Sequence, residues 1–123
     1  MYRVLKPGTG RMLFSDALVI GGLIAHDEIA TRSSIGFYIF SPPGENEQLI
    51  RSAGFSDIKV IDKTESAACI AARWHDARQK HRARLVATEG AAKWEGLQRF
   101  LSSVQALTEQ RRLLRLLYQA QKA

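Results

Sequence analysis

The stretch that decides the fold reads PGTG at Pro7–Gly10 and RMLFSDALVI at Arg11–Ile20. The first part predicts a turn, because proline fixes one backbone dihedral and glycine permits positive φ. The second part predicts a strand near 11–20 with apolar residues on both faces, which is typical of a buried strand of parallel type. We expect its one acidic residue, Asp16, to lie where the strand ends.

The segment after this strand carries signals for two helices and a second strand. Asp27 can cap a short helix, acidic residues open the next one, and Gly54 supplies a left-handed helix end. The predicted elements are a helix near 27–34, a helix near 45–53 and a strand near 57–64. Strand, helices and strand in this order predict an α/β fold with a parallel pair of strands and a right-handed crossover.

The rest of the chain is predicted to be mostly helical. Apolar residues recur at helical spacing, and Gly90 interrupts them, so we expect helices near 66–88 and 91–109. The apolar run near 113–121 is a candidate last strand, which would need a neighbouring strand on each side. We therefore divide the chain into an α/β part, 1–65, and a basic helical part, 66–123.

Composition is that of one globular domain: 123 residues, 46% hydrophobic and 24% charged, which argues against disorder. The net charge of +6 is uneven, with 7 basic and 8 acidic residues through Glu65 but 11 and 4 from Ser66 onward. The single cysteine, Cys69, excludes an internal disulfide. No leader sequence and no long apolar run is visible, so we expect a soluble cytoplasmic protein without a membrane partner.

Two motifs carry a resemblance to a known family. Residues 3–16, with LKPGTG at Leu5–Gly10, resemble the helix end, turn and fifth strand of class I S-adenosylmethionine-dependent methyltransferases, although Thr9 separates the two glycines that are adjacent in the usual form. LIRSAGF at Leu49–Phe55, followed by IKVID at Ile58–Asp62, resembles the helix, turn and sixth strand of the same fold. The order and spacing of the two motifs agree with that family.

The resemblance implies that the chain is the C-terminal half of a Rossmann-like methyltransferase domain. The family's cofactor-binding βαβ unit and its glycine-rich turn have no counterpart here, since Pro7–Gly10 precedes a strand instead of following one. S-adenosylmethionine is thus expected in the intact enzyme, and this chain alone is expected neither to bind it nor to be active. A homodimer, or an N-terminal half supplied by another chain, would complete the fold.

What this half contributes in such enzymes is mainly the pocket for a small-molecule methyl acceptor. Ligands of open α/β sheets lie beyond the carboxyl ends of the strands, which places Asp16 and the insertion 21–44 over the transferred methyl group. The substrate-binding candidates are Asp16, Arg32, Ser33 and Tyr38, with His26 as a further polar group. No catalytic, cofactor-binding or metal-ligating residue is assigned. The Thr64-Glu65 pair after Asp62 is similar to the sequence at this place in methyltransferases that act on small amines such as sarcosine or phosphoethanolamine.

Each candidate also has a plain structural interpretation. Asp16 could cap a turn, and Arg32 could form a surface ion pair with Asp27 or Glu28. Tyr38 could be core packing. Other residues are best explained as core, namely Cys69 as a small buried thiol and Trp74 and Trp94 through their place in apolar stripes.

The basic helical part supports a rival class, a stand-alone interaction or nucleic-acid-binding module without catalysis. Its cations are Arg73, Arg78, Lys80, Arg82 and Arg84. These residues spread around most of the helix, and no aromatic stacking platform accompanies them. Nucleic acid is therefore not the expected partner.

Overall fold

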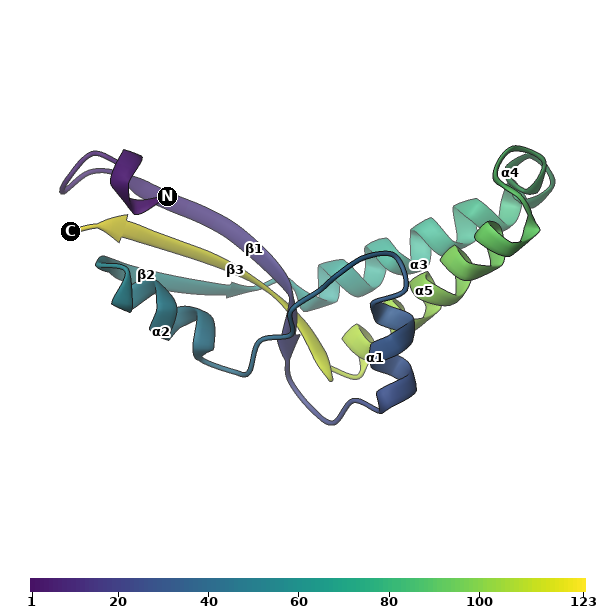
Figure 1. Ribbon diagram of the computed structural model, residues 1–123, viewed down its shortest axis with the longest axis horizontal. Coiled ribbons are helices and arrows are strands. Elements are labelled where there is room, and N and C mark those ends of the chain that lie inside the picture. The colour runs from purple at the N-terminus through teal and green to yellow at the C-terminus, as the bar shows by residue number, and fades with distance from the viewer.

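The computed structural model describes residues 1–123 and shows a small sheet at one end, from which a helical hairpin projects (Figure 1). The sheet has three strands in the order β1-β3-β2. They are β1 (Arg11–Ile20), β2 (Phe55–Asp62) and β3 (Leu113–Lys122). The candidate last strand is confirmed, and it has the two neighbours that its apolar sequence requires.

The predicted pairing of the first two strands needs correction. β3 is antiparallel to both β1 and β2, so these two run in the same direction but do not pair with each other. The central place of β3 follows from the helical hairpin, which brings the chain back to the sheet between the two earlier strands. Sequence order alone does not contain that information.

The prediction that Asp16 ends its strand is wrong, because β1 continues to Ile20. Pairing with β3 shifts register between Asp16 and Val19, and the Asp16 carboxylate accepts a hydrogen bond from the Leu18 amide at 2.8 Å. The strand therefore continues past Asp16 through a bulge, in which the Asp16 carboxylate is hydrogen-bonded to the backbone of the strand itself.

The second strand lies two residues earlier than the expected 57–64. Phe55 already pairs with Lys122, and the strand ends at Asp62 because Thr64 begins the next helix. The Asp62 carboxylate accepts a hydrogen bond from the amide of Thr64, the first residue of that helix, at 2.9 Å.

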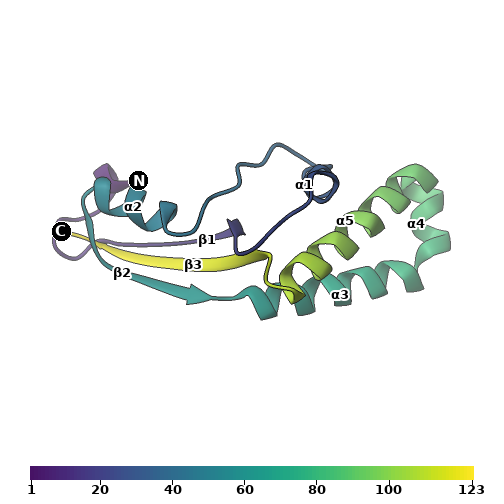
Figure 2. The ribbon, with the colours of Figure 1, turned by 90° about the horizontal axis from the view of Figure 1, so that it is seen from below.

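Two short helices connect β1 to β2. Helix α1 (His26–Arg32) is shorter than the expected 27–34, and the predicted Asp27 cap is replaced by Glu28, whose carboxylate accepts from the Ala25 amide at 3.1 Å. Helix α2 (Glu45–Ser52) lies on one face of the sheet (Figure 2). Gly54 follows it with φ +95°, the left-handed end that the sequence predicts.

The helix expected near 66–88 is two helices, α3 (Thr64–Lys80) and α4 (Arg82–Glu89), which are separated at His81. Tertiary contacts explain the break: Arg78 of α3 is paired with Glu89, and the Arg82 guanidinium lies 5.0 Å from the Trp94 ring centroid. Helix α5 (Ala91–Glu109) then returns beside α3.

Two expected core residues of α3 lie at the surface. Trp74 is 56% exposed and Cys69 is exposed, because α3 buries the face that carries Ala68 and Ala71. Trp94 on α5 is buried, as its apolar stripe predicts.

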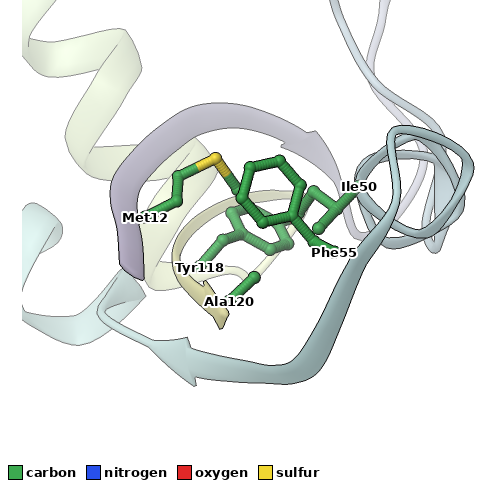
Figure 3. Packing of buried hydrophobic residues seen from close by; sticks show 5 residues of the cluster. All are labelled: Met12, Ile50, Phe55, Tyr118 and Ala120. Atoms are coloured by element: carbon green, nitrogen blue, oxygen red, sulfur yellow. The ribbon is translucent and has the colours of Figure 1, made fainter. Parts of the chain in front are cut away.

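The core of the sheet forms beneath α2 (Figure 3). Its buried members are Met12, Ile50, Phe55, Tyr118 and Ala120. A short 3-10 helix, η1 (Tyr2–Val4), adds Tyr2 edge-on to Phe55. The opposite face of the sheet carries no helix in Figure 2, and Leu13 there is 64% exposed. The sheet is therefore covered on one face only.

Candidate functional site

A cleft of about 270 Å³ lies among α3, α5, the start of β3 and the segment that follows α1. Twelve of its sixteen lining residues are hydrophobic. Its polar and aromatic members include Arg32, Tyr38, Arg78, Phe100 and Arg115. No acidic residue lines the cleft, so its only formal charges are positive.

One wall of the cleft belongs to residues 21–40, which we call the strap. The strap leaves the sheet after Ile20 and returns at Ser41, where the Ile20 amide donates to Ser41 O and the Ser41 amide donates to Leu18 O, both at 2.9 Å. Gly21 is needed where the strap begins, because a Cβ there would lie 2.5 Å from the Arg111 carbonyl oxygen. Because its two ends are hydrogen-bonded to each other, the strap is a compact loop, and α1 within it lies beside the cleft.

Arg32, the last residue of α1, is the unusual group of the cleft. It is only 7% exposed, and its Nε and Nη1 atoms are buried without a hydrogen-bond partner. Its guanidinium carbon lies 5.0 Å from the Tyr38 ring centroid and 5.1 Å from that of Phe100. The interpretation of Arg32 as half of a surface ion pair with Asp27 or Glu28 is therefore wrong.

Burial lowers the pKa of the Arg32 guanidinium, Tyr38 opposes that effect, and the nearby positive charge of Arg115 adds to it. An arginine remains charged under such conditions, because its ordinary pKa lies so far above neutrality. Two buried N–H donor atoms of a charged group without an acceptor are costly, so the arrangement is one that an anion would complete.

The other two arginines of the cleft differ in what they contact. Arg78 is committed to the protein, since it is paired with Glu89 and its Nε donates to Gln98 Oε1 at 3.2 Å. The Arg115 guanidinium donates only to the hydroxyl of Ser15, at 3.3 Å. Arg32 and Arg115 thus give the cleft two guanidinium groups without a carboxylate partner, and both favour a negatively charged ligand.

Asp16 does not line the cleft. Its carboxylate accepts from Asn46 Nδ2 at 2.8 Å and from the Ser41 hydroxyl at 3.4 Å, and Asn46 also donates to the Tyr118 hydroxyl at 3.3 Å. Burial raises the pKa of Tyr118, the buried phenol of this network. The network fixes α2 against β1 and β3.

The remaining sequence candidates fall in different places. Tyr38 lines the cleft beside Arg32, whereas Ser33 follows α1 without lining the cleft, and His26 is exposed at the start of α1. The structure therefore brings Arg32 and Tyr38 together in the cleft, has Ser33 beside Arg32 but outside the lining, and leaves Asp16 and His26 outside the cleft.

Sequence reasoning missed Phe100 and Arg115. Phe100 had a usable signal, because it stands three residues after Leu97 in the apolar stripe of α5. Arg115 had none, since its position beside the cleft depends on the pairing of β3. Across the chain, no three His, Cys, Asp or Glu side chains gather as metal ligands would, and no helix is long and apolar enough to cross a membrane.

The arrangement of these strands and helices is similar to part of the fold of solved methyltransferases. Phosphoethanolamine N-methyltransferase 2 of Haemonchus contortus matches with a TM-score of 0.84 and 21% identity over 98% of this chain and 28% of its own, in a complex with phosphomonomethylethanolamine and S-adenosylhomocysteine. Its S-adenosyl-L-methionine complex matches with a TM-score of 0.82 and 20% identity over the same shares.

A third structure, described as a sarcosine dimethylglycine methyltransferase from Galdieria sulphuraria, matches with a TM-score of 0.82 and 15% identity over 99% of this chain and 44% of its own. The chain thus spans less than half the length of the structures it matches. No family model and no curated protein matches the chain in sequence. At these identities the likeness establishes the fold, in agreement with the resemblance carried by the two motifs.

Proposed function

We propose that this chain is the acceptor-binding part of an S-adenosylmethionine-dependent methyltransferase whose acceptor is a small amine with an anionic group. The observation that carries the proposal is Arg32, a buried guanidinium with two unpartnered nitrogen atoms in a cleft without acidic residues. The acceptors named for the matched structures support it, since phosphomonomethylethanolamine joins an amine to a phosphate, and sarcosine and dimethylglycine join an amine to a carboxylate.

Arg32 would hold the phosphate or carboxylate, and Tyr38 would orient the acceptor beside it. The apolar wall of α3 and α5 would exclude water, which matters because positioning and dehydration are most of what a protein adds to methyl transfer. Ser33, next to Arg32, is a further proposed contact. Asp16, proposed at the same site, would act through the network that fixes α2 to β1.

The residues of this chain do not fit S-adenosylmethionine. The turn Pro7–Gly10 leads into β1, and a Cβ at Gly10 would lie 2.6 Å from the Lys6 carbonyl oxygen, so that glycine serves the turn itself. Gly21 and Gly22 do follow a strand, but both of their amides donate to the Arg112 carbonyl. We therefore propose that the cofactor of the intact enzyme is bound outside this chain, by a preceding half or by another chain. Micromolar binding of S-adenosylmethionine to the 123-residue chain in calorimetry would contradict this part of the proposal.

Acceptor binding can be tested by calorimetry on the chain with phosphoethanolamine and sarcosine, using ethanolamine as the matched compound without an anionic group. We expect the first two to bind and ethanolamine not to bind. Arg32→Gln should weaken binding by about tenfold or more, the effect of losing a charged hydrogen bond. Arg99→Gln, at an exposed position of α5, is the control variant.

Methyl transfer itself is tested with the reading frame that contains this chain, with S-adenosylmethionine labelled on its methyl group. Labelled product from phosphoethanolamine or sarcosine would support the proposal. Equal binding of ethanolamine by the chain, or no binding of either anionic amine, would contradict it.

The rival interpretation as a nucleic-acid module is not favoured. Two of its five cations are engaged within the protein, Arg78 with Glu89 and Arg82 with the Trp94 ring. Titration of labelled duplex DNA at two salt concentrations separates the two classes, since phosphate binding would weaken steeply with salt.

A further inference from the structure

The strap is held to the start of β3 by a single residue, Arg112. Arg112, just before β3, donates from Nη1 to Glu28 Oε1 at 2.5 Å and to the Leu23 carbonyl at 3.4 Å. Its own carbonyl accepts from the amides of Gly21 and Gly22, at 2.9 and 3.2 Å. One residue of the sheet end therefore contacts the strap through both its side chain and its backbone.

The ion pair joins the strap to Arg112 at a defined point of α1. Glu28 lies in the first turn of α1, and its Oε1 also accepts from the Ala25 amide. The Arg112 guanidinium is held in place by its Nε, which donates to Gln110 Oε1 at 2.8 Å. The bond between the two lowers the pKa of Glu28 and raises the pKa of Arg112, so both are charged at neutral pH.

Glu28 and Arg32 are four residues apart in one helix and therefore lie on the same face of α1. The first is fixed to Arg112, and the second is buried against Phe100. A rotation or displacement of α1 that breaks the ion pair would therefore also move the guanidinium of Arg32.

Burial of apolar side chains adds little to the stability of the strap against the rest of the protein. Four of its large apolar side chains are at least half exposed: Leu23 at 91%, Ile35 at 50%, Phe37 at 108% and Ile39 at 86%. A segment with so few buried apolar contacts depends more than usual on its polar contacts, and such segments open locally at low free-energy cost.

We propose that the Glu28–Arg112 pair is a tether that holds the strap over the cleft and so positions Arg32 for the anionic group of the acceptor. The acceptor role of Arg32 rests on the proposed function, whereas the tether itself is a property of this chain. Glu28 and Arg112 are positioning residues, because neither lines the cleft.

The tether is tested by distances between two spin labels, one on the native Cys69 and one on Phe37→Cys, both at exposed positions. We expect a narrow distance distribution, which broadens when the pair is broken by Glu28→Gln or by Arg112→Gln. Glutamine at 28 keeps an acceptor for the Ala25 amide, so that variant removes the charge alone. The ratio of closed to open populations should fall about two- to fivefold, the range for partly exposed ion pairs.

Matched controls separate the tether from general charge effects. Glu45→Gln in the first turn of α2 and Arg99→Gln on α5 should leave the distribution narrow. The double variant Glu28→Gln with Arg112→Gln should broaden it no more than Arg112→Gln alone, because that single variant already removes both the ion pair with Glu28 and the contact with the Leu23 carbonyl. An unchanged distribution in both single variants would overturn the tether.

The positioning role is tested by titrating the same proteins with phosphoethanolamine. The dissociation constant should rise in both single variants by the factor by which the closed fraction falls, while the melting temperature stays within about 2 °C, as a local opening demands. A broadened strap with an unchanged dissociation constant would overturn the positioning of Arg32. If the parent chain does not bind phosphoethanolamine, the proposed function fails. The label distances alone then test whether the Glu28–Arg112 pair holds the strap.

Discussion

The guanidinium carbon of Arg32 lies 5.1 Å from the centroid of the Phe100 ring, which places the end of α1 directly on α5. The contact closes one side of the cleft, yet it leaves two nitrogen atoms of Arg32 without a hydrogen-bond partner. A charged donor that is costly to bury and has nitrogen atoms without an internal acceptor is typical of a binding site, where stability is traded for function.

Replacement of Arg32 by methionine should separate stability from binding. Arg32→Met keeps an apolar chain against Phe100 and removes a buried charge, so we expect the free energy of unfolding to rise or to stay within about 1 kcal/mol of the parent. Binding of phosphoethanolamine should disappear. Urea unfolding and calorimetry measure the two quantities, and a loss of several kcal/mol would show that Arg32 is primarily a structural residue.

Asp16 should affect the fold more than Arg32 does. Asp16→Ala leaves the Leu18 amide, the Asn46 amide group and the Ser41 hydroxyl without their acceptor. We expect the free energy of unfolding to fall by about 1–3 kcal/mol, measured by urea unfolding. Asp16→Asn, which retains one acceptor oxygen, should lose less. An Asp16→Ala protein as stable as the parent but unable to bind phosphoethanolamine would place Asp16 in direct contact with the acceptor.

Acid should weaken the junction between β2 and α3. Burial raises the pKa of Asp62, but hydrogen bonds from Thr64 and Arg111 outweigh that effect and lower the pKa from 3.8 to about 2. Because the folded pKa is depressed, the contribution of Asp62 is fully present above about pH 4 and is lost as the pH falls toward 2.

Asp62→Asn tests this window. The side chain of Asp62 is 41% exposed, so solvent screening limits the expected loss at pH 7 to less than about 1 kcal/mol. The difference between parent and variant should vanish near pH 2. Urea unfolding at several pH values measures it, and a constant difference from pH 7 to pH 2 would exclude the Asp62 carboxylate as its cause.

The uncovered face of the sheet should promote self-association. β1 pairs only with β3 along its ladder, and Leu13 on this strand is 64% exposed. We expect sedimentation to show concentration-dependent association, which Leu13→Lys reduces, because an added charge opposes edge and face pairing. Val4→Lys, at a residue that is 72% exposed outside the sheet, is the control. A well-folded monomer of the parent at high concentration would contradict the expectation.

Local chemistry explains which elements the sequence could predict. The turn before β1, the glycine after α2 and the apolar run of β3 each depend on residues close together in the chain, and the structure confirms these elements. The same holds for the two motifs behind the family resemblance. Arg32 and Tyr38 were found among the candidates because the insertion that contains them follows a strand end, where ligands of α/β folds bind.

Contacts between distant residues decided the rest. The central place of β3, the break at His81 and the exposure of Trp74 all depend on where α5 returns beside α3, and no local pattern encodes that position. The same applies to Arg32, whose spacing from Glu28 favours a surface ion pair. In the structure Glu28 is paired with Arg112 instead, and the Arg32 guanidinium lies against Phe100. The sequence by itself determined the elements and their family resemblance, because turns, caps and periodicity act over a few residues. Only the tertiary structure decided the strand order and the charge of the cleft, because both require residues far apart in the chain to meet.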